Sequence, residues 1–271
     1  MQIVYGILIA LGALLLLYTL SVMGRRNHPG LKPLQGWSYA HRGLHGEGRP
    51  ENSMAAFRAA LEQGYGIELD VHLLADGNLA VIHDPSLKRT AGADVLIEDL
   101  TTEDLQNYRL EGTDEVIPTF RQVLELFDGK APIILELKAE RNNHAALTDT
   151  AIAQLKDYPG VYCVESFDPR CVLHLKKHHR HIVRGQLTEN FLAGKGKLPW
   201  VLKALLTHQF GNFLLMPDFV SYKFADRKTL GNFLVRKLWK VQGVTWTIKT
   251  PEDHAQAVKE GWIPIFEGFR P

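Results

Sequence analysis

Cysteine is scarce in this sequence, with only Cys163 and Cys171 among 271 residues. So few cysteines exclude the disulfide framework that holds small secreted domains together. Net charge is also nearly absent, at +1, which argues against a bulk polyanion such as nucleic acid as a partner. No internal repeat or low-complexity tract is visible. With 45% hydrophobic and 23% charged residues, the composition is that of an ordinary globular protein.

Long uncharged runs are rare as well, and the exception lies at the N-terminus. Residues 3–23 carry no charge and are rich in Leu, Ile and Ala, and a membrane span needs ~20 apolar residues. A cleaved signal peptide fits less well, because no Lys or Arg precedes the run and Met23 is not the small residue that a cleavage site requires. We therefore predict a transmembrane anchor over residues 1–24, followed by a short linker over residues 25–35.

Basic residues follow the apolar run and predict its orientation. Arg25, Arg26 and Lys32 lie immediately after it, and positive charge next to a span is retained on the cytoplasmic side. The sequence therefore predicts a single-pass membrane protein whose remaining domain, residues 36–271, lies in the cytoplasm.

Two acidic residues share one face of a predicted strand. Residues 67–71 alternate apolar and polar side chains, which is typical of a β-strand, and residues two apart point to the same side. Glu68 and Asp70 therefore point together. Two carboxylates at this spacing can hold one hard cation through oxygen ligands, although such a pair is also typical of the wet face of an edge strand.

Two histidines lie on either side of this strand in the sequence. An apolar run, residues 37–40, leads into His41 and Arg42, and a second β segment, residues 79–82, ends in His83. Paired histidines can supply a general acid and a general base. The planar guanidinium of an adjacent arginine matches the oxygens of a phosphate. A cation site, an arginine and two histidines together indicate phosphoryl chemistry.

The order of these motifs resembles the glycerophosphodiester phosphodiesterase family. Residues 41–90 contain His-Arg-Gly, Pro-Glu-Asn-Ser, Ile-Glu-Leu-Asp-Val, Asp-Gly, His-Asp and Leu-Lys-Arg-Thr in that order. Residues 166–168 continue the resemblance with Ser-Phe-Asp. The resemblance implies a TIM barrel that uses a divalent cation to hydrolyse glycerophosphodiesters to glycerol phosphate and an alcohol.

A third acidic residue, Glu136, lies at the end of another apolar strand pattern, residues 133–137. In a barrel, residues at the carboxyl end of a strand reach the active site. The resemblance then makes Glu68, Asp70 and Glu136 the ligands of one divalent cation, either Mg²⁺ or Ca²⁺, since all three are hard oxygen ligands. Glu51 is a further candidate for this set, as a direct ligand or through water.

The remaining roles concern proton transfer and substrate. One of His41 and His83 removes a proton from the nucleophile, and the other protonates the leaving alkoxide. The nucleophile is water or, by resemblance, a neighbouring glycerol hydroxyl. Arg42 and Lys138 contact the phosphate, while Trp246 either walls the pocket or belongs to the core.

Eight strand patterns alternate with helical patterns, which predicts a closed parallel barrel. The chain is long enough for one TIM barrel of ~250 residues. Residues 87–117 resemble a small insertion near the mouth, after the second strand. The predicted strands are residues 37–40, 67–71, 133–137, 161–164, 181–187, 218–222, 243–248 and 263–266.

Three functions stay open at this point. The first is hydrolysis of soluble glycerophosphodiesters, and the second is the same reaction on membrane lysophospholipids, as a lysophospholipase D. The anchor and an apolar, basic segment between residues 187 and 243 support the second; that segment is either a solvated face or a surface that lies against an anionic leaflet. A non-catalytic, membrane-tethered binding protein is disfavoured, because every residue that the chemistry needs is present. The basic residues are Lys195, Lys197, Lys203, Lys223, Arg227, Lys228, Arg236, Lys237 and Lys240.

Overall fold

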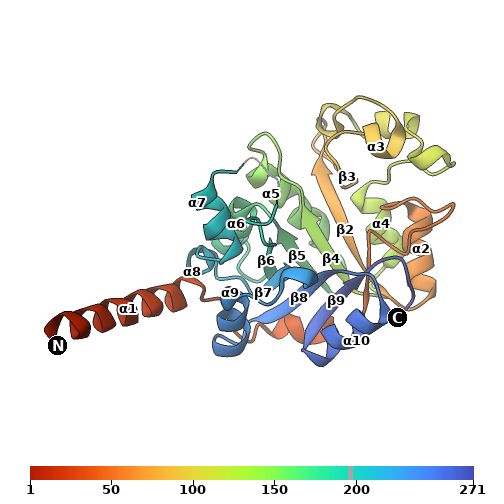
Figure 1. Ribbon diagram of the computed structural model, residues 1–271. Helices are drawn as coiled ribbons and strands as arrows, with labels where there is room; N and C mark the ends of the chain where they lie inside the picture. The colour runs from red at the N-terminus through yellow and green to blue at the C-terminus, as the bar shows by residue number, and fades with distance from the viewer. Residues whose placement is uncertain (195–197) are drawn as a thin grey trace.

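In the computed structural model, eight parallel strands close into a barrel, and a long N-terminal helix projects from its side (Figure 1). The structure describes residues 1–194 and 198–271, so Lys195 and Lys197 of the basic segment lie outside the described residues. The strands are β1 (Tyr39–His41), β2 (Gly66–Leu73), β3 (Leu79–Val81), β4 (Ile133–Leu137), β5 (Tyr162–Ser166), β6 (Arg184–Thr188), β7 (Phe219–Lys223), β8 (Gln242–Ile248) and β9 (Trp262–Phe266).

The strand order confirms the predicted barrel. Neighbours run β1-β9-β8-β7-β6-β5-β4-β2, and β1 pairs with β2 to close the ring. The short β3 pairs in the antiparallel direction with the carboxyl end of β2 and is not one of the eight strands of the ring. Because all eight barrel strands are parallel, their carboxyl ends meet at one mouth, where active sites of this fold are built.

Helices cover the outside of the barrel (Figure 1). Ser53 caps the first of these helices on the barrel, α2, by accepting a hydrogen bond from the Ala56 amide at 3.1 Å. The helices are α1 (Gln2–Ser21), α2 (Met54–Glu62), α3 (Lys88–Ala91), α4 (Phe120–Phe127), α5 (His144–Leu155), α6 (Pro169–His178), α7 (Trp200–Thr207), α8 (Asn212–Leu215), α9 (Leu230–Phe233) and α10 (Pro251–Lys259).

Two of the predicted strands start more than one residue too early. The strand expected at residues 181–187 starts at Arg184, because the preceding residues form a turn in which the Ile182 amide donates to the His179 carbonyl at 3.0 Å. The first strand, expected at residues 37–40, is shifted in the same direction: it starts at Tyr39 and includes His41. This shift matters for function, because it puts His41 at the carboxyl end of a barrel strand.

The barrel interior changes from apolar to charged along its axis. Near the amino ends of the strands, a buried cluster includes Tyr39, Ile134 and Phe219. On β2, Ile67 and Leu69 belong to the core between strands and helices, while the alternate residues point into the barrel. The strand period of two therefore separates the apolar core from the acidic residues of the mouth.

Residues 87–117 form the predicted small insertion after the second strand. Its chain is a series of short turns around α3, held by a satellite core of buried apolar side chains. That core includes Leu87, Ile97, Leu105, Leu110 and Ile117. The insertion therefore has its own packing and stands beside β3, above the barrel in Figure 1.

Among the described residues, α1 is the helix that is long and apolar enough to cross a membrane, with a mean hydropathy of 2.4. Its side chains are exposed or half-exposed along their whole length. Its carboxyl end, in contrast, is packed on the barrel. The Tyr18 ring lies 4.7 Å from that of Phe210, and the Trp239 indole donates to the Thr19 carbonyl at 2.7 Å.

The segment after α1, predicted as a linker, is also in contact with the barrel. Val22 is buried, and Arg25 forms an ion pair with the buried Asp218. A 3₁₀ helix, Pro29–Leu34, then buries two leucines in the apolar cluster inside the barrel. These contacts fix the direction in which α1 leaves the barrel.

Candidate active site

Three buried carboxylates converge at the mouth of the barrel. Asp70 on β2 lies directly opposite Glu136 on β4 in the strand register, and Glu68 is two residues before Asp70 on the same face. Each residue is at most 6% exposed. One oxygen from each carboxylate lies within 4.8 Å of the other two. The register of two parallel strands is thus what brings the three acids together.

Lys138 lies among these acids. Its ammonium nitrogen is 3.0 Å from Asp70 Oδ1 and 2.7 Å from Glu136 Oε1. Burial alone would lower the pKa of Lys138, but the two carboxylates raise it above its usual value. Lys138 therefore stays charged and offsets part of the negative charge of the group.

The charge of the three carboxylates is nevertheless incompletely balanced. Burial, followed by repulsion from its acidic neighbours, raises the pKa of Glu68 well above its usual value, and burial raises that of Glu136 to about 7. Burial also opposes ionisation of Asp70, but Lys138 and nearby positive groups hold its pKa below the usual range. A hard divalent cation fits this set of buried oxygen donors, because it would favour the ionised form of all three.

Two histidines at the mouth are each held by a carboxylate. His41 Nδ1 donates to Glu267 at 2.6 Å, and His83 Nδ1 donates to Asp84 at 2.5 Å. The hydrogen bond from His41 lowers the pKa of Glu267 to about 2, so this carboxylate is ionised at neutral pH. Fixing Nδ1 in this way leaves Nε2 of each ring available for proton transfer.

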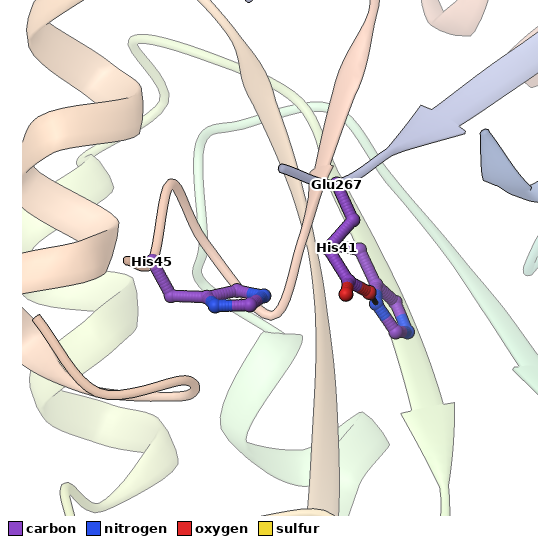
Figure 2. Close-up of side chains that lie close together, drawn as sticks. All are labelled: His41, His45 and Glu267. Carbon is purple, nitrogen blue, oxygen red and sulfur yellow. Dashed lines mark hydrogen bonds and ion pairs between the residues drawn. The ribbon is translucent and has the colours of Figure 1, made fainter. Parts of the chain in front are cut away.

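Figure 2 shows the first of these pairs, with His41 at the end of β1 and Glu267 just after β9. The His45 ring points toward the same carboxylate from the loop that follows β1. Burial lowers the pKa of His45, which favours its neutral form. Glu267 thus lies between two rings, and its hydrogen bond goes to His41.

Arg42 contacts three acidic residues at the mouth. Its backbone amide donates to Glu68 at 3.2 Å, and its guanidinium lies 3.4 Å from Asp70 and donates to Glu51 at 2.9 Å. Arg42 has a φ of +55°, a left-handed conformation that costs energy outside glycine and is common at functional sites. Glu51 in turn accepts from Arg89 at 2.7 Å. Among the described residues, Glu51 therefore pairs with arginines, outside the group of three acids.

A small inner pocket of about 50 Å³ lies between these groups. Its lining includes His41, His83, Glu68, Glu136 and Trp246. Trp246 also packs against the apolar cluster inside the barrel. The tryptophan for which the sequence left two alternatives therefore does both: it walls the pocket and borders the core. A cleft of about 550 Å³ continues outward from this pocket past Lys138.

Sequence reasoning missed several residues of this site. Glu267 was not among the predicted site residues, and its position directly after a barrel strand is the signal that could have identified it. Asn52 donates to Asp70 at 2.9 Å, and Asp84 follows His83 directly. Glu165 is buried and lies opposite Glu136 in the register of β5 and β4. Each of these residues contacts or neighbours a residue that had been predicted.

Comparison with known proteins connects this geometry to one group of sequences. The model of the glycerophosphoryl diester phosphodiesterase family matches residues 41–267. Glycerophosphodiester phosphodiesterase from Caldanaerobacter subterraneus subsp. tengcongensis is 29% identical over 232 residues, which cover 82% of this chain and 89% of that protein. Lysophospholipase D GDPD1 from Rattus norvegicus is 37% identical over 116 residues, a shorter match that covers 38% of this chain and 36% of the rat protein.

A solved structure shares the fold. The phosphodiesterase of Oleispira antarctica, in complex with the product sn-glycerol-3-phosphate, superposes with a TM-score of 0.70. The match covers 85% of this chain and 92% of that one at 22% sequence identity. At this identity the likeness supports the barrel architecture and no finer detail.

Proposed function

This chain belongs to the glycerophosphoryl diester phosphodiesterase family, and from that premise we propose that its barrel mouth hydrolyses glycerophosphodiesters to glycerol phosphate and an alcohol. Family membership makes it a phosphoric diester hydrolase. The observation that carries the proposal is the convergence of three buried carboxylates beside two carboxylate-bound histidines. This arrangement combines a cation site with an acid–base pair, which phosphodiester hydrolysis requires.

The family depends on a divalent metal, and the three carboxylates fit one. Glu68, Asp70 and Glu136 would hold Mg²⁺ or Ca²⁺, both of which take oxygen ligands. When bound, the cation supplies positive charge for the phosphodiester oxygens. Glu51 would act from the second layer, because its hydrogen bonds with Arg42 and Arg89 hold the Arg42 guanidinium beside Asp70.

The chain's own residues would take separate roles in binding the substrate and in proton transfer. Arg42 and Lys138 would bind the anionic phosphodiester and stabilise charge as it builds up on the phosphoryl oxygens. Nε2 of one histidine, His41 or His83, would take a proton from the nucleophile, and Nε2 of the other would protonate the leaving alkoxide. Glu267 and Asp84 would keep the two rings oriented and stabilise whichever imidazolium forms. Trp246 would exclude water from one wall.

The nucleophile stays open between water and a glycerol hydroxyl of the substrate. A hydroxyl two carbons from the phosphate oxygen would give a cyclic phosphate first, which water then opens. Both routes need the same proton acceptor and donor. A membrane-tethered protein without catalysis remains disfavoured, since both histidines and all three acids lie together in the mouth.

Hydrolysis of lysophospholipids is a second candidate. The relative from Rattus norvegicus is named a lysophospholipase D, and the same phosphorus–oxygen bond is broken in both reactions. The apolar α1 also supports this candidate, because it would hold the barrel near lipid. We propose that α1 spans the membrane once and that the catalytic domain is cytoplasmic, on the charge of Arg25, Arg26 and Lys32.

Hydrolysis of glycerophosphocholine by the full chain in detergent tests the proposed function. We expect choline and glycerol phosphate as products, loss of activity with a chelator, and recovery with Mg²⁺ or Ca²⁺. His41→Ala and His83→Ala should each lower kcat by roughly 10²–10⁴-fold, because each removes a proton-transfer group. His208→Ala is the matched control. Its ring packs against Tyr18 near the end of α1, so this variant should hydrolyse the substrate at the rate of the unmodified chain. A near-normal rate in either active-site variant, with the fold intact, would refute the assignment.

A further inference from the structure

An apolar groove of about 430 Å³ lies on the barrel wall between α6, α7 and α8. A volume of this size is within the ~300–1,000 Å³ typical of ligand sites. Its polar lining residues are largely engaged within the protein: Thr188 donates to the Leu206 carbonyl at 3.1 Å, and Gln209 donates to Asn232 at 2.8 Å. The apolar lining includes Leu173, Leu202, Leu205, Leu206, Phe210 and Phe213. The groove therefore offers mainly hydrocarbon to a ligand.

The groove adjoins the catalytic cleft. Leu206 lines both cavities, and the hydrogen bond from Thr188 holds this leucine beside the carboxyl end of β6. Beyond Leu206, the cleft is lined by Lys138, Glu136 and His83. A ligand that occupies both cavities must be apolar at one end, because hydrocarbon lines the groove. Its other end lies among side chains of both charges, where Lys138 and the cation proposed at the three carboxylates would bind a phosphodiester.

The opposite side of the groove adjoins α1. Phe210 lines the groove, and its ring lies 4.7 Å from that of Tyr18 near the end of α1. Figure 1 shows α7, α8 and α9 on the side of the barrel from which α1 projects. Trp200 and Val201 on α7 and Leu214 on α8 are exposed on these helices. If α1 spans a bilayer, the groove lies between the lipid surface and the catalytic residues.

We propose that this groove binds the acyl chain of a lysophospholipid while its phosphodiester lies in the catalytic cleft. The proposal rests on the proposed function, since the bond broken is the same. A phosphorus–oxygen bond forms to the oxygen of water, and the bond from phosphorus to the head-group oxygen breaks. The head-group alcohol leaves with one proton, and the acylated glycerol phosphate stays in the groove. The groove acts by binding the chain and takes no part in proton transfer.

Variants of the groove test this proposal in the full chain, reconstituted in phosphatidylcholine vesicles. Leu205→Gln puts a polar group into the groove and keeps helix propensity, because Gln and Leu are similar helix formers. Val258→Gln, on α10 away from the groove, is the control; Leu205 and Val258 are 42% and 54% exposed. Two substrates are compared, lysophosphatidylcholine and glycerophosphocholine, which carry the same head group with and without an acyl chain.

We expect Leu205→Gln to raise KM for lysophosphatidylcholine by about tenfold or more and to leave turnover of glycerophosphocholine unchanged. Val258→Gln should change neither. In addition, kcat/KM of the unmodified chain should rise with acyl-chain length, and this dependence should flatten in Leu205→Gln. Equal effects of Leu205→Gln on both substrates, or no dependence on chain length, would overturn the groove assignment. If the unmodified chain hydrolysed neither substrate, the proposed function would be refuted instead.

Discussion

At the scale of single residues, His41 and His83 are each paired with a carboxylate on the Nδ1 side of the ring. The two partners differ in where they come from. Asp84 is the next residue after His83, whereas Glu267 lies 226 positions after His41. The pair of His83 and Asp84 can be predicted from the sequence, because the two residues are adjacent. The second exists because β1 and β9 are neighbours in the closed barrel, so it depends on the fold.

Glu267→Gln tests whether the carboxylate beside His41 assists catalysis. Gln keeps the size of the side chain but removes the charge that would stabilise a protonated His41, so we expect kcat for glycerophosphocholine to fall by roughly 10²-fold with little change in KM. Steady-state kinetics at several pH values would measure this. Lys249→Gln is the control, because Lys249 reaches the same carboxylate at 3.5 Å but is mostly exposed. Equal rates for Glu267→Gln and the unmodified chain would contradict the role of Glu267.

At the scale of elements, the contacts between α1 and the barrel could not be predicted from a sequence pattern. Hydropathy identifies α1, and Pro29, Gly30 and Pro33 suggest a short linker. The structure shows instead that Val22 packs beside Val220 and that Arg25 pairs with Asp218. Partners nearly 200 residues away in the chain determine this geometry, as for Arg25 and Asp218, and local composition carries no information about them.

The orientation of α1 can be measured with reporters at the carboxyl terminus. That terminus lies beside Tyr65, whose hydroxyl donates to the Pro271 carbonyl at 3.2 Å, and Figure 1 shows it away from α1. A fused reporter should therefore leave the contacts between α1 and the barrel undisturbed. We expect a fluorescent protein that folds in the cytoplasm to be active and an alkaline phosphatase, which needs an oxidising compartment, to be inactive. The reverse pattern would contradict a cytoplasmic catalytic domain.

At the scale of the whole molecule, periodicity predicted the barrel and motif order predicted most of its mouth. Alternation on β2 and β4 was enough to orient Glu68, Asp70 and Glu136, because side chains on a strand have a period of two. Alternation alone could not show that Lys138 lies 3.0 Å from Asp70 on the neighbouring strand, because that contact depends on strand register. The groove between α6 and α8 was also beyond prediction, because it is formed by helix packing.

At the same scale, the proposed ion site would make cation binding sensitive to pH. Metal ligands must lose their protons before they bind, and burial raises the pKa of Glu136 to about 7. Below that pH the Glu136 carboxyl is protonated, so cation affinity should fall as pH decreases through about 7 and should rise above it. Binding near neutral pH should release protons for the same reason.

Calorimetric titration of Mg²⁺ and Ca²⁺ into the full chain measures the cation site most directly. We expect saturable binding that strengthens between about pH 6 and about pH 8, and affinity lower by about tenfold or more in Glu136→Gln. Glu140→Gln, a nearby residue that is exposed, should bind like the unmodified chain. Absence of cation binding by the folded chain, or equal affinity in Glu136→Gln, would contradict a metal site at these three carboxylates.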